Sequence, residues 1–80
     1  MNIKAKQNIL EQAGYRFHIE DDNWFIVAKV ITPDGWHYTE QEYLETELYR
    51  IVIESKLLEN LVSKAWSHYQ ERGAVNEDTA

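Results

Sequence analysis

Three histidines and fourteen Asp and Glu residues are the side chains of this 80-residue sequence best suited to chemistry. Such residues can form metal sites or general acid–base pairs. His18 and His37 are predicted to lie on the two outer strands of one sheet, about 10 Å apart, which is too far for a metal site without a third ligand between them. His68 follows Ser67 on a predicted helix, where adjacent side chains point apart. The spacing therefore predicts no catalytic residue, no metal site and no cofactor, and we expect a protein that is not an enzyme.

Composition places these residues in one small domain. The formal net charge is −6 and there is no cysteine, so disulfides are excluded and a reducing, cytoplasmic location is expected. The negative charge argues against broad binding to nucleic-acid phosphates or to anionic lipid. No apolar run approaches the ~20 residues of a membrane span. We expect a single domain over residues 1–72 and a flexible acidic tail over residues 73–80.

The first half of the chain is predicted to form a short helix and an antiparallel meander. A rough helical stripe predicts a helix over residues 2–13, ended by Gly14 at positive φ. The alternation in YRFHIE predicts a strand, and WFIVAKVIT predicts a second strand after a turn centred on Asp21-Asp22. Thr32-Pro33-Asp34-Gly35 predicts a tight turn with Gly35 in the left-handed region, before a short third strand at Trp36-His37-Tyr38.

The second half is predicted to be one long helix. Thr39-Glu40-Gln41-Glu42 is typical of a capping box, and no Gly or Pro follows until Gly73. Such a helix of ~33 residues would be ~50 Å long and would overhang its sheet, unless it breaks near residues 53–56. Its predicted buried stripe comprises Leu44, Leu48, Ile51, Ser55, Leu58, Val62, Ala65 and Tyr69, widened by Leu57, Leu61 and Trp66. The predicted fold class is α+β, in the order αβββα, with the C-terminal helix packed on one sheet face.

This order of elements is shared with double-stranded RNA-binding domains. Those domains begin their last helix with lysines that contact phosphate. Residues 39–43 read TEQEY here and are acidic. The characteristic motif is absent, and the sequence assigns no family.

The two turns predict which side chains share each sheet face. They place Ile19 opposite Trp24, Phe17 opposite Ile26 and Tyr15 opposite Ala28, while Thr32 faces Trp36 and Val30 faces Tyr38. One face is predicted to form the core wall and contains Tyr15, Phe17, Ile19, Trp24, Ile26, Ala28, Val30, Trp36 and Tyr38. The other face contains Arg16, His18, Glu20, Phe25, Val27, Lys29, Ile31 and His37.

The second face is unusually apolar at its centre, because Phe25, Val27 and Ile31 stand where a solvated strand carries polar residues. The sequence therefore predicts a protein-interaction module that self-associates as a dimer, through this face, the overhanging helix, or both. The predicted interaction surface consists of Arg16, His18, Phe25, Val27, Lys29, Ile31 and His37.

Three alternatives remain open. The N-terminal helix, or the helix after Ser55, could cover the second face within one chain. The face could bind single-stranded nucleic acid, with Arg16, Lys29 and His37 around Phe25. The acidic chain could also block a basic surface of another protein as an inhibitor.

Overall fold

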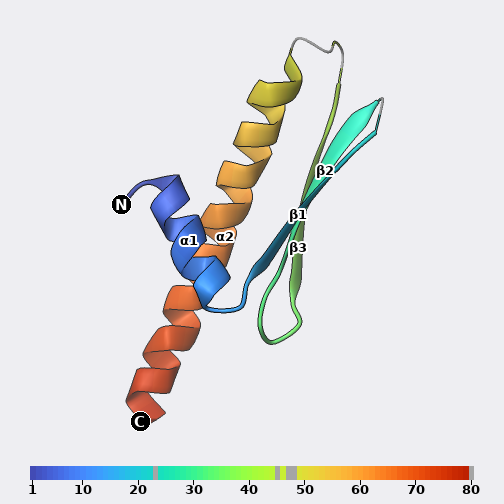
Figure 1. The fold of residues 1–80 in the computed structure, drawn as a ribbon. Helices are drawn as coiled ribbons and strands as arrows, with labels where there is room; N and C mark the ends of the chain where they lie inside the picture. Colours follow the sequence, from blue (N-terminus) through green and yellow to red (C-terminus); the bar gives the residue numbers. More distant parts are fainter. Residues whose placement is uncertain (23, 45, 47–48, 80) are drawn as a thin grey trace.

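The chain folds as helix, three strands and a long helix in the computed structural model, which describes residues 1–22, 24–44, 46 and 49–79, with side chains up to residue 72. The elements are α1 (Ile3–Gln12), β1 (Arg16–Asp21), β2 (Phe25–Ile31), β3 (His37–Tyr43) and α2 (Arg50–Thr79) (Figure 1). The strands form one antiparallel sheet in the order β1-β2-β3. The predicted αβββα fold, of the α+β class, is confirmed.

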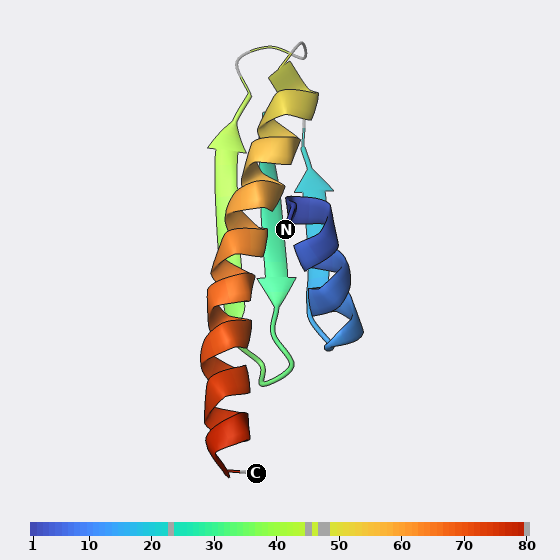
Figure 2. The same ribbon diagram turned by 90° about the vertical axis from the view of Figure 1, so that its left-hand side faces the viewer.

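Both helices lie on the same face of the sheet. Figure 2 shows α2 crossing in front of the strands and α1 beside it, in front of β1. Contacts of α2 with β2, β3 and α1 hold this layer together. In the part of the chain that the structure describes, no element covers the opposite face (Figure 1). The alternative in which a helix folds over the second face is therefore wrong.

Helix α1 begins and ends as its sequence predicts. Asn2 is the N-cap, and its side-chain oxygen accepts from the Ala5 N–H at 2.8 Å. Gly14 follows the C-cap with φ +101°. The N–H of Gly14 donates to Glu11 O, and the N–H of Tyr15 donates to Leu10 O, which is the Schellman pattern. This motif turns the chain sharply from α1 into β1.

The first hairpin has a different register from the predicted one. Phe17 pairs with Val30 and Ile19 with Ala28, so β1 is displaced by four residues along β2. The hairpin closes with the Asp22 N–H donating to Phe25 O, which leaves Asp21 inside the strand. An acidic residue is tolerated there because its carboxylate pairs with Arg50 of α2. Since a displacement by an even number of residues keeps every side chain on its face, both predicted faces survive.

The second hairpin has the predicted register but a longer third strand. Val30 pairs with Tyr38, and the Thr32 N–H donates to Trp36 O across a turn in which Gly35 has φ +90°. The capping box predicted at Thr39–Glu42 is wrong, because these residues belong to β3. Strand β3 pairs with β2 along its whole length, from Phe25↔Tyr43 to Ile31↔His37. A helix from residue 40 would have left the buried backbone groups of β2 without partners on that side.

Helix α2 begins at Arg50 and passes through residues 53–56 without a break. It continues beyond Gly73, where the sequence predicts a stop, and Figure 2 shows its C-terminal part extending past the strands. With 30 residues, α2 is about 45 Å long, whereas the seven-residue strands β2 and β3 are each about 23 Å long. No helix among the described residues is both long enough and apolar enough to cross a membrane.

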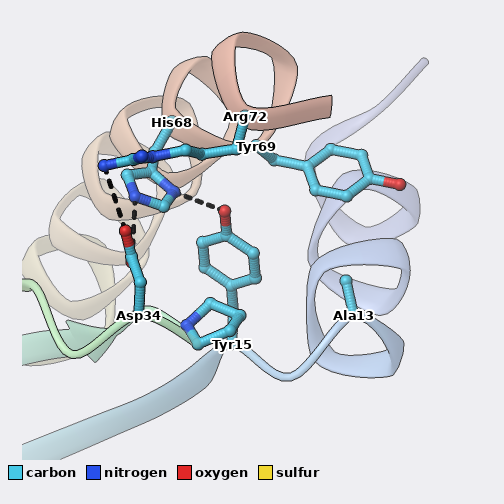
Figure 3. A pocket seen from close by; sticks show the side chains of 7 residues that line it. Ala13, Tyr15, Asp34, His68, Tyr69 and Arg72 are labelled. Atoms are coloured by element: carbon cyan, nitrogen blue, oxygen red, sulfur yellow. Dashed lines mark hydrogen bonds and ion pairs between the residues drawn. The ribbon is translucent and has the colours of Figure 1, made fainter. Parts of the chain in front are cut away.

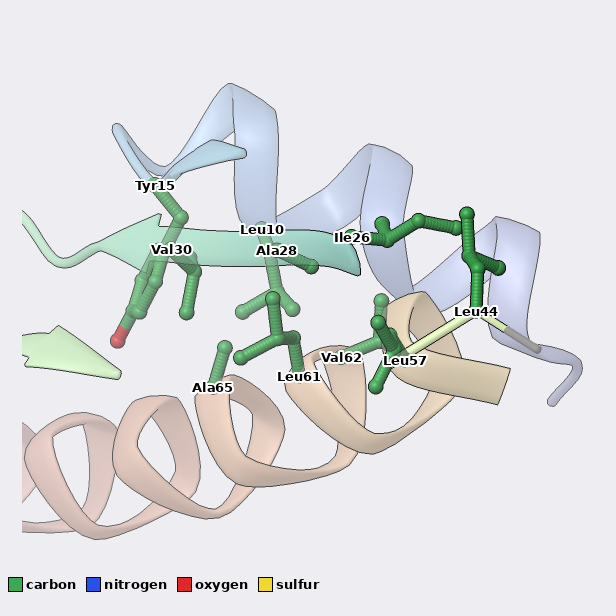
Figure 4. Packing of buried hydrophobic residues seen from close by; sticks show 10 residues of the cluster. All are labelled: Leu10, Tyr15, Ile26, Ala28, Val30, Leu44, Leu57, Leu61, Val62 and Ala65. Carbon is green, nitrogen blue, oxygen red and sulfur yellow. The ribbon is translucent and has the colours of Figure 1, made fainter. Parts of the chain in front are cut away.

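The core lies between the centre of β2 and one stripe of α2 (Figure 4). It is the cluster of Leu10, Tyr15, Ile26, Ala28, Val30, Leu44, Leu57, Leu61, Val62 and Ala65. Leu57, Leu61, Val62 and Ala65 of the predicted stripe are buried, but Ile51 is 76% exposed and Ser55 is also exposed, so the prediction fails in the first turns of α2. Leu48 of the predicted stripe lies outside the described residues.

Three residues of the predicted core wall are exposed. Trp24 and Trp36, at opposite ends of the sheet, are 72% and 60% exposed, and Ile19 on the edge strand β1 is 43% exposed. Trp24 stands at the β1–β2 hairpin, and Trp36 stands at the Pro33 turn, where it borders a pocket with Tyr38, His68 and Arg72. The alternation pattern carries no information on how far such end positions are covered. Tyr15, Ile26, Ala28 and Val30 are buried as predicted, and Phe17 and Tyr38 pack against the cluster.

Candidate functional site

The sheet face opposite the helices, here called the open face, is the largest candidate site. Strand pairing arranges its side chains in rows across the three strands. From the β1–β2 hairpin toward the Pro33 turn, the rows are Phe25–Tyr43, Glu20–Val27–Gln41, His18–Lys29–Thr39 and Arg16–Ile31–His37. All seven residues of the predicted interaction surface belong to this face. His18 and His37 lie in different rows on the two edge strands, so they do not form a pair.

The middle strand of this face is apolar and partly sheltered by its neighbours. Phe25, Val27 and Ile31 are half-buried, and Phe25 makes an edge contact with Tyr43 at a centroid distance of 6.1 Å. Tyr43 is 74% exposed. A shallow hollow of about 190 Å³ lies beside Phe25 and Val27 and is bordered by Glu20. Apolar side chains next to a hollow are the surface that a protein partner fills with its own side chains.

Charge is distributed unevenly over the open face. Glu20 stands toward the β1–β2 hairpin, whereas Arg16 and His37 stand at the other end, with Lys29 between them. With both histidines neutral, these side chains sum to +1, while the whole chain carries −6. The face is thus less acidic than the chain as a whole, with its one carboxylate toward the β1–β2 hairpin and its cations toward the Pro33 turn.

Sequence reasoning missed the β3 contribution to this face, namely Thr39, Gln41 and Tyr43. These residues were assigned to a helix because TEQE has the composition of a capping box. HYTEQEY offered no periodic signal, because two of its helix-side positions, 40 and 42, are glutamates and the apolar–polar alternation ends at Tyr38. Tyr43 adds a second aromatic ring beside Phe25.

A second cluster of polar groups joins α2 to the Pro33 turn and to the start of β1 (Figure 3), and it was also missed. His68 is 8% exposed, and its Nδ1 lies 2.5 Å from the Tyr15 hydroxyl. Its Nε2 lies 3.2 Å from Asp34 Oδ1, without hydrogen-bond alignment, so this contact is electrostatic. Arg72 is 3.1 Å from the other oxygen of Asp34, and Thr32 Oγ1 donates to Oδ1 at 2.5 Å. The buried stripe of α2 includes position 68, which the predicted stripe did not.

The order Asp34–His68–Tyr15 is that of a proton relay, but its terminal oxygen is not activated. An ionised Asp34 can only accept, so we assign an imidazole proton to Nε2, which faces it, and the Tyr15 hydroxyl pairs with Nδ1. Burial, with the nearby Asp34 charge, raises the pKa of Tyr15 above its usual 10.0. The phenol therefore stays protonated at neutral pH, and the cluster acts as a tether between α2, the Pro33 turn and the start of β1. A cavity of about 400 Å³ beside this cluster is lined by Ala13, Tyr15, Pro33, Asp34, His68, Tyr69 and Arg72 (Figure 3).

This tether predicts acid sensitivity. The hydrogen bond from Thr32, together with His68 and Arg72, outweighs desolvation and lowers the pKa of the Asp34 carboxyl below its usual 3.8. Stability from this group is complete above that usual value and is lost as pH falls through the lowered one. We expect Asp34→Asn to unfold at lower urea concentration than wild type at pH 7, and to lose less stability between about pH 5 and pH 2.

Glu54 has a pKa shift opposite in direction to that of Asp34 and therefore serves as a comparison. Burial, with the neighbouring Asp21 carboxylate, raises the pKa of Glu54 above its usual 4.5, so its protonation on acidification favours the folded state. Glu54→Gln should therefore lose more stability than wild type over the same pH range. Equal slopes for Asp34→Asn and wild type would contradict the assigned role of Asp34.

Among the described residues, no group of three or more His, Asp or Glu side chains is placed to hold a metal ion. No protein-family model matches the chain, and neither a curated protein nor a solved structure was found to be similar to it. The open face and the tether are thus characterised by their own geometry.

Proposed function

We propose that this chain is a small non-catalytic protein-interaction module that self-associates, with the open face as its binding surface. The observation that carries the proposal is the placement of both helices on one side of the sheet. Phe25, Val27 and Ile31 are left on a face that no described element covers. Apolar groups on such a face gain most when another protein removes them from water.

Charge and chemistry favour a protein partner over the alternatives. Nucleic-acid binding through Phe25 and Tyr43 would need a basic surround, but Arg16 and Lys29 are opposed by Glu20 on the face and by a net charge of −6 on the chain. The protonated phenol of Tyr15 supports a non-catalytic role, because the relay-like cluster lacks an activated group. The lack of cysteine favours a reducing, cytoplasmic location.

The proposal predicts a specific effect of Val27→Glu. Val27 lies at the centre of the open face, so a carboxylate there would be desolvated when a partner covers it. We expect association to weaken by at least about tenfold, which corresponds to about 1.4 kcal/mol, with little change in the thermal midpoint of the isolated chain. Sedimentation velocity and thermal unfolding of the variant and wild type measure the two effects.

A matched control is Ser63→Glu, which adds the same charge at an exposed position of α2. Its association should equal that of wild type. If Val27→Glu associates as wild type does, or if both variants weaken association equally, the open face is not the binding surface.

A further inference from the structure

We infer that the partner on the open face is a second copy of this chain, stacked sheet to sheet, with the two β2 strands antiparallel about a two-fold axis that crosses the strands beside Ala28. This inference rests on the proposed function and adds the geometry of the contact. The observation that supports this geometry is the order of apolar, acidic and basic rows along the open face.

Two symmetric stackings are possible for identical sheets with aligned strands. If the two-fold axis runs along the strands, each β2 residue lies over its own copy. Lys29 then meets Lys29, and Arg16 of β1 meets His37 of β3 in the second copy, because the edge strands exchange. This arrangement places like charges opposite each other at the centre of the contact, which costs free energy.

If the axis runs across the strands, the rows reverse and their chemistry matches. The Phe25–Tyr43 row then lies over the Arg16–Ile31–His37 row of the second copy, so Phe25 meets Ile31. The Glu20–Val27–Gln41 row lies over the His18–Lys29–Thr39 row. Glu20 therefore faces His18 and comes within one row of Arg16, and Lys29 packs its methylene groups on Val27. In this arrangement Glu20 is the acidic side chain nearest to Arg16 of the second copy, and Lys29 no longer lies over its own copy.

Surface shape agrees with this arrangement. The hollow beside Phe25 and Val27 is also lined by three carboxylates, Glu20, Asp21 and Asp22, and in this arrangement it lies toward the row of the second copy that carries Arg16 and Ile31. The face measures roughly 14 by 23 Å from strand spacing and rise, which is small for a protein interface. We therefore expect a weak dimer whose formation depends on concentration.

The test is a charge-reversal cycle measured by sedimentation equilibrium from about 1 µM to 1 mM. Arg16 and Glu20 are four residues apart on β1, about 13 Å, so they do not pair within one chain. We expect Arg16→Glu and Glu20→Arg each to weaken the dimer about tenfold, because each change places like charges together at two symmetric positions. The double variant should regain wild-type affinity within about threefold, since both contacts are then reversed.

Cysteine cross-linking tests the relative direction of the two β2 strands in a separate experiment. It is feasible because the natural chain has no cysteine, so each introduced cysteine is unique. A mixture of Phe25→Cys chains and Ile31→Cys chains should be joined by a short bismaleimide, whereas either chain alone should give far less product.

Each other result overturns the inference in a distinguishable way. A wild-type chain that stays monomeric throughout the concentration range excludes the second copy, and leaves a different protein as the partner of the open face. A dimer that Val27→Glu disrupts, but that the double variant does not restore, uses the open face in another arrangement. A dimer that Val27→Glu leaves intact forms elsewhere on the chain and contradicts the proposed function as well.

Discussion

Leu61→Ala is expected to lower the free energy of unfolding by about 2–5 kcal/mol, because it leaves a cavity at the centre of the core. Leu61 is 0% exposed and lies between Leu57 and Ala65 on α2, facing β2 (Figure 4). A folded domain of this size has a total stability of about 4–12 kcal/mol at 0.05–0.15 kcal/mol per residue. The Leu61 side chain alone thus accounts for a large share of the total stability. Urea unfolding followed by tryptophan fluorescence measures the loss.

Ile51→Ala is the matched control on the same helix. Ile51 is 76% exposed, although the sequence pattern assigned it to the buried stripe. Its truncation should change stability by less than about 0.5 kcal/mol. If Ile51→Ala costs as much as Leu61→Ala, α2 is rotated about its axis relative to the arrangement described above.

Ala28→Glu is expected to lower the free energy of unfolding by more than about 3 kcal/mol. Ala28 is 0% exposed, on the helix-covered face of β2 and within the core cluster. The larger side chain overpacks the core and brings a carboxyl into an apolar site, and each effect is destabilising. Far-ultraviolet circular dichroism and urea unfolding report this loss directly.

The comparison with Val27→Glu makes the result diagnostic of sheet orientation. The two variants place the same residue at adjacent positions of one strand, where successive side chains point to opposite faces. Ala28→Glu should destabilise the fold, whereas Val27→Glu should leave the fold intact and weaken association. If Val27→Glu unfolds the chain as Ala28→Glu does, the open face is covered within the monomer, and the interaction proposal loses its basis.

Local sequence chemistry was sufficient for much of the site. Alternation in RFHIE and the two predicted turns determined which residues share a face, and the assignment survived a four-residue error in register because that error was even. Gly14 and Gly35 were correctly assigned positive φ, since both follow turn-forming sequences that need a residue without Cβ. All seven predicted surface residues consequently lie on the open face.

Contacts between distant segments decided the rest. Residues 39–42 satisfy a helix cap locally, yet they form β3, because the backbone of β2 needs a second pairing partner and Glu40 finds Lys64 of α2 at 2.7 Å. His68 meets Tyr15 across 53 positions of sequence, a contact that no local pattern encodes.

The exposure of Trp24 and Trp36 also depends on contacts between elements rather than on local sequence. Hydrophobic character predicts burial only where another layer packs on the residue, and Trp24 and Trp36 stand at hairpin ends outside the core cluster. The sequence alone therefore determined the elements of the first half, the two faces of the sheet and the residues of the candidate surface. The tertiary structure decided that both helices cover the same face, where α2 begins and which turns of α2 are buried, because those features depend on packing between elements rather than on local conformational preference.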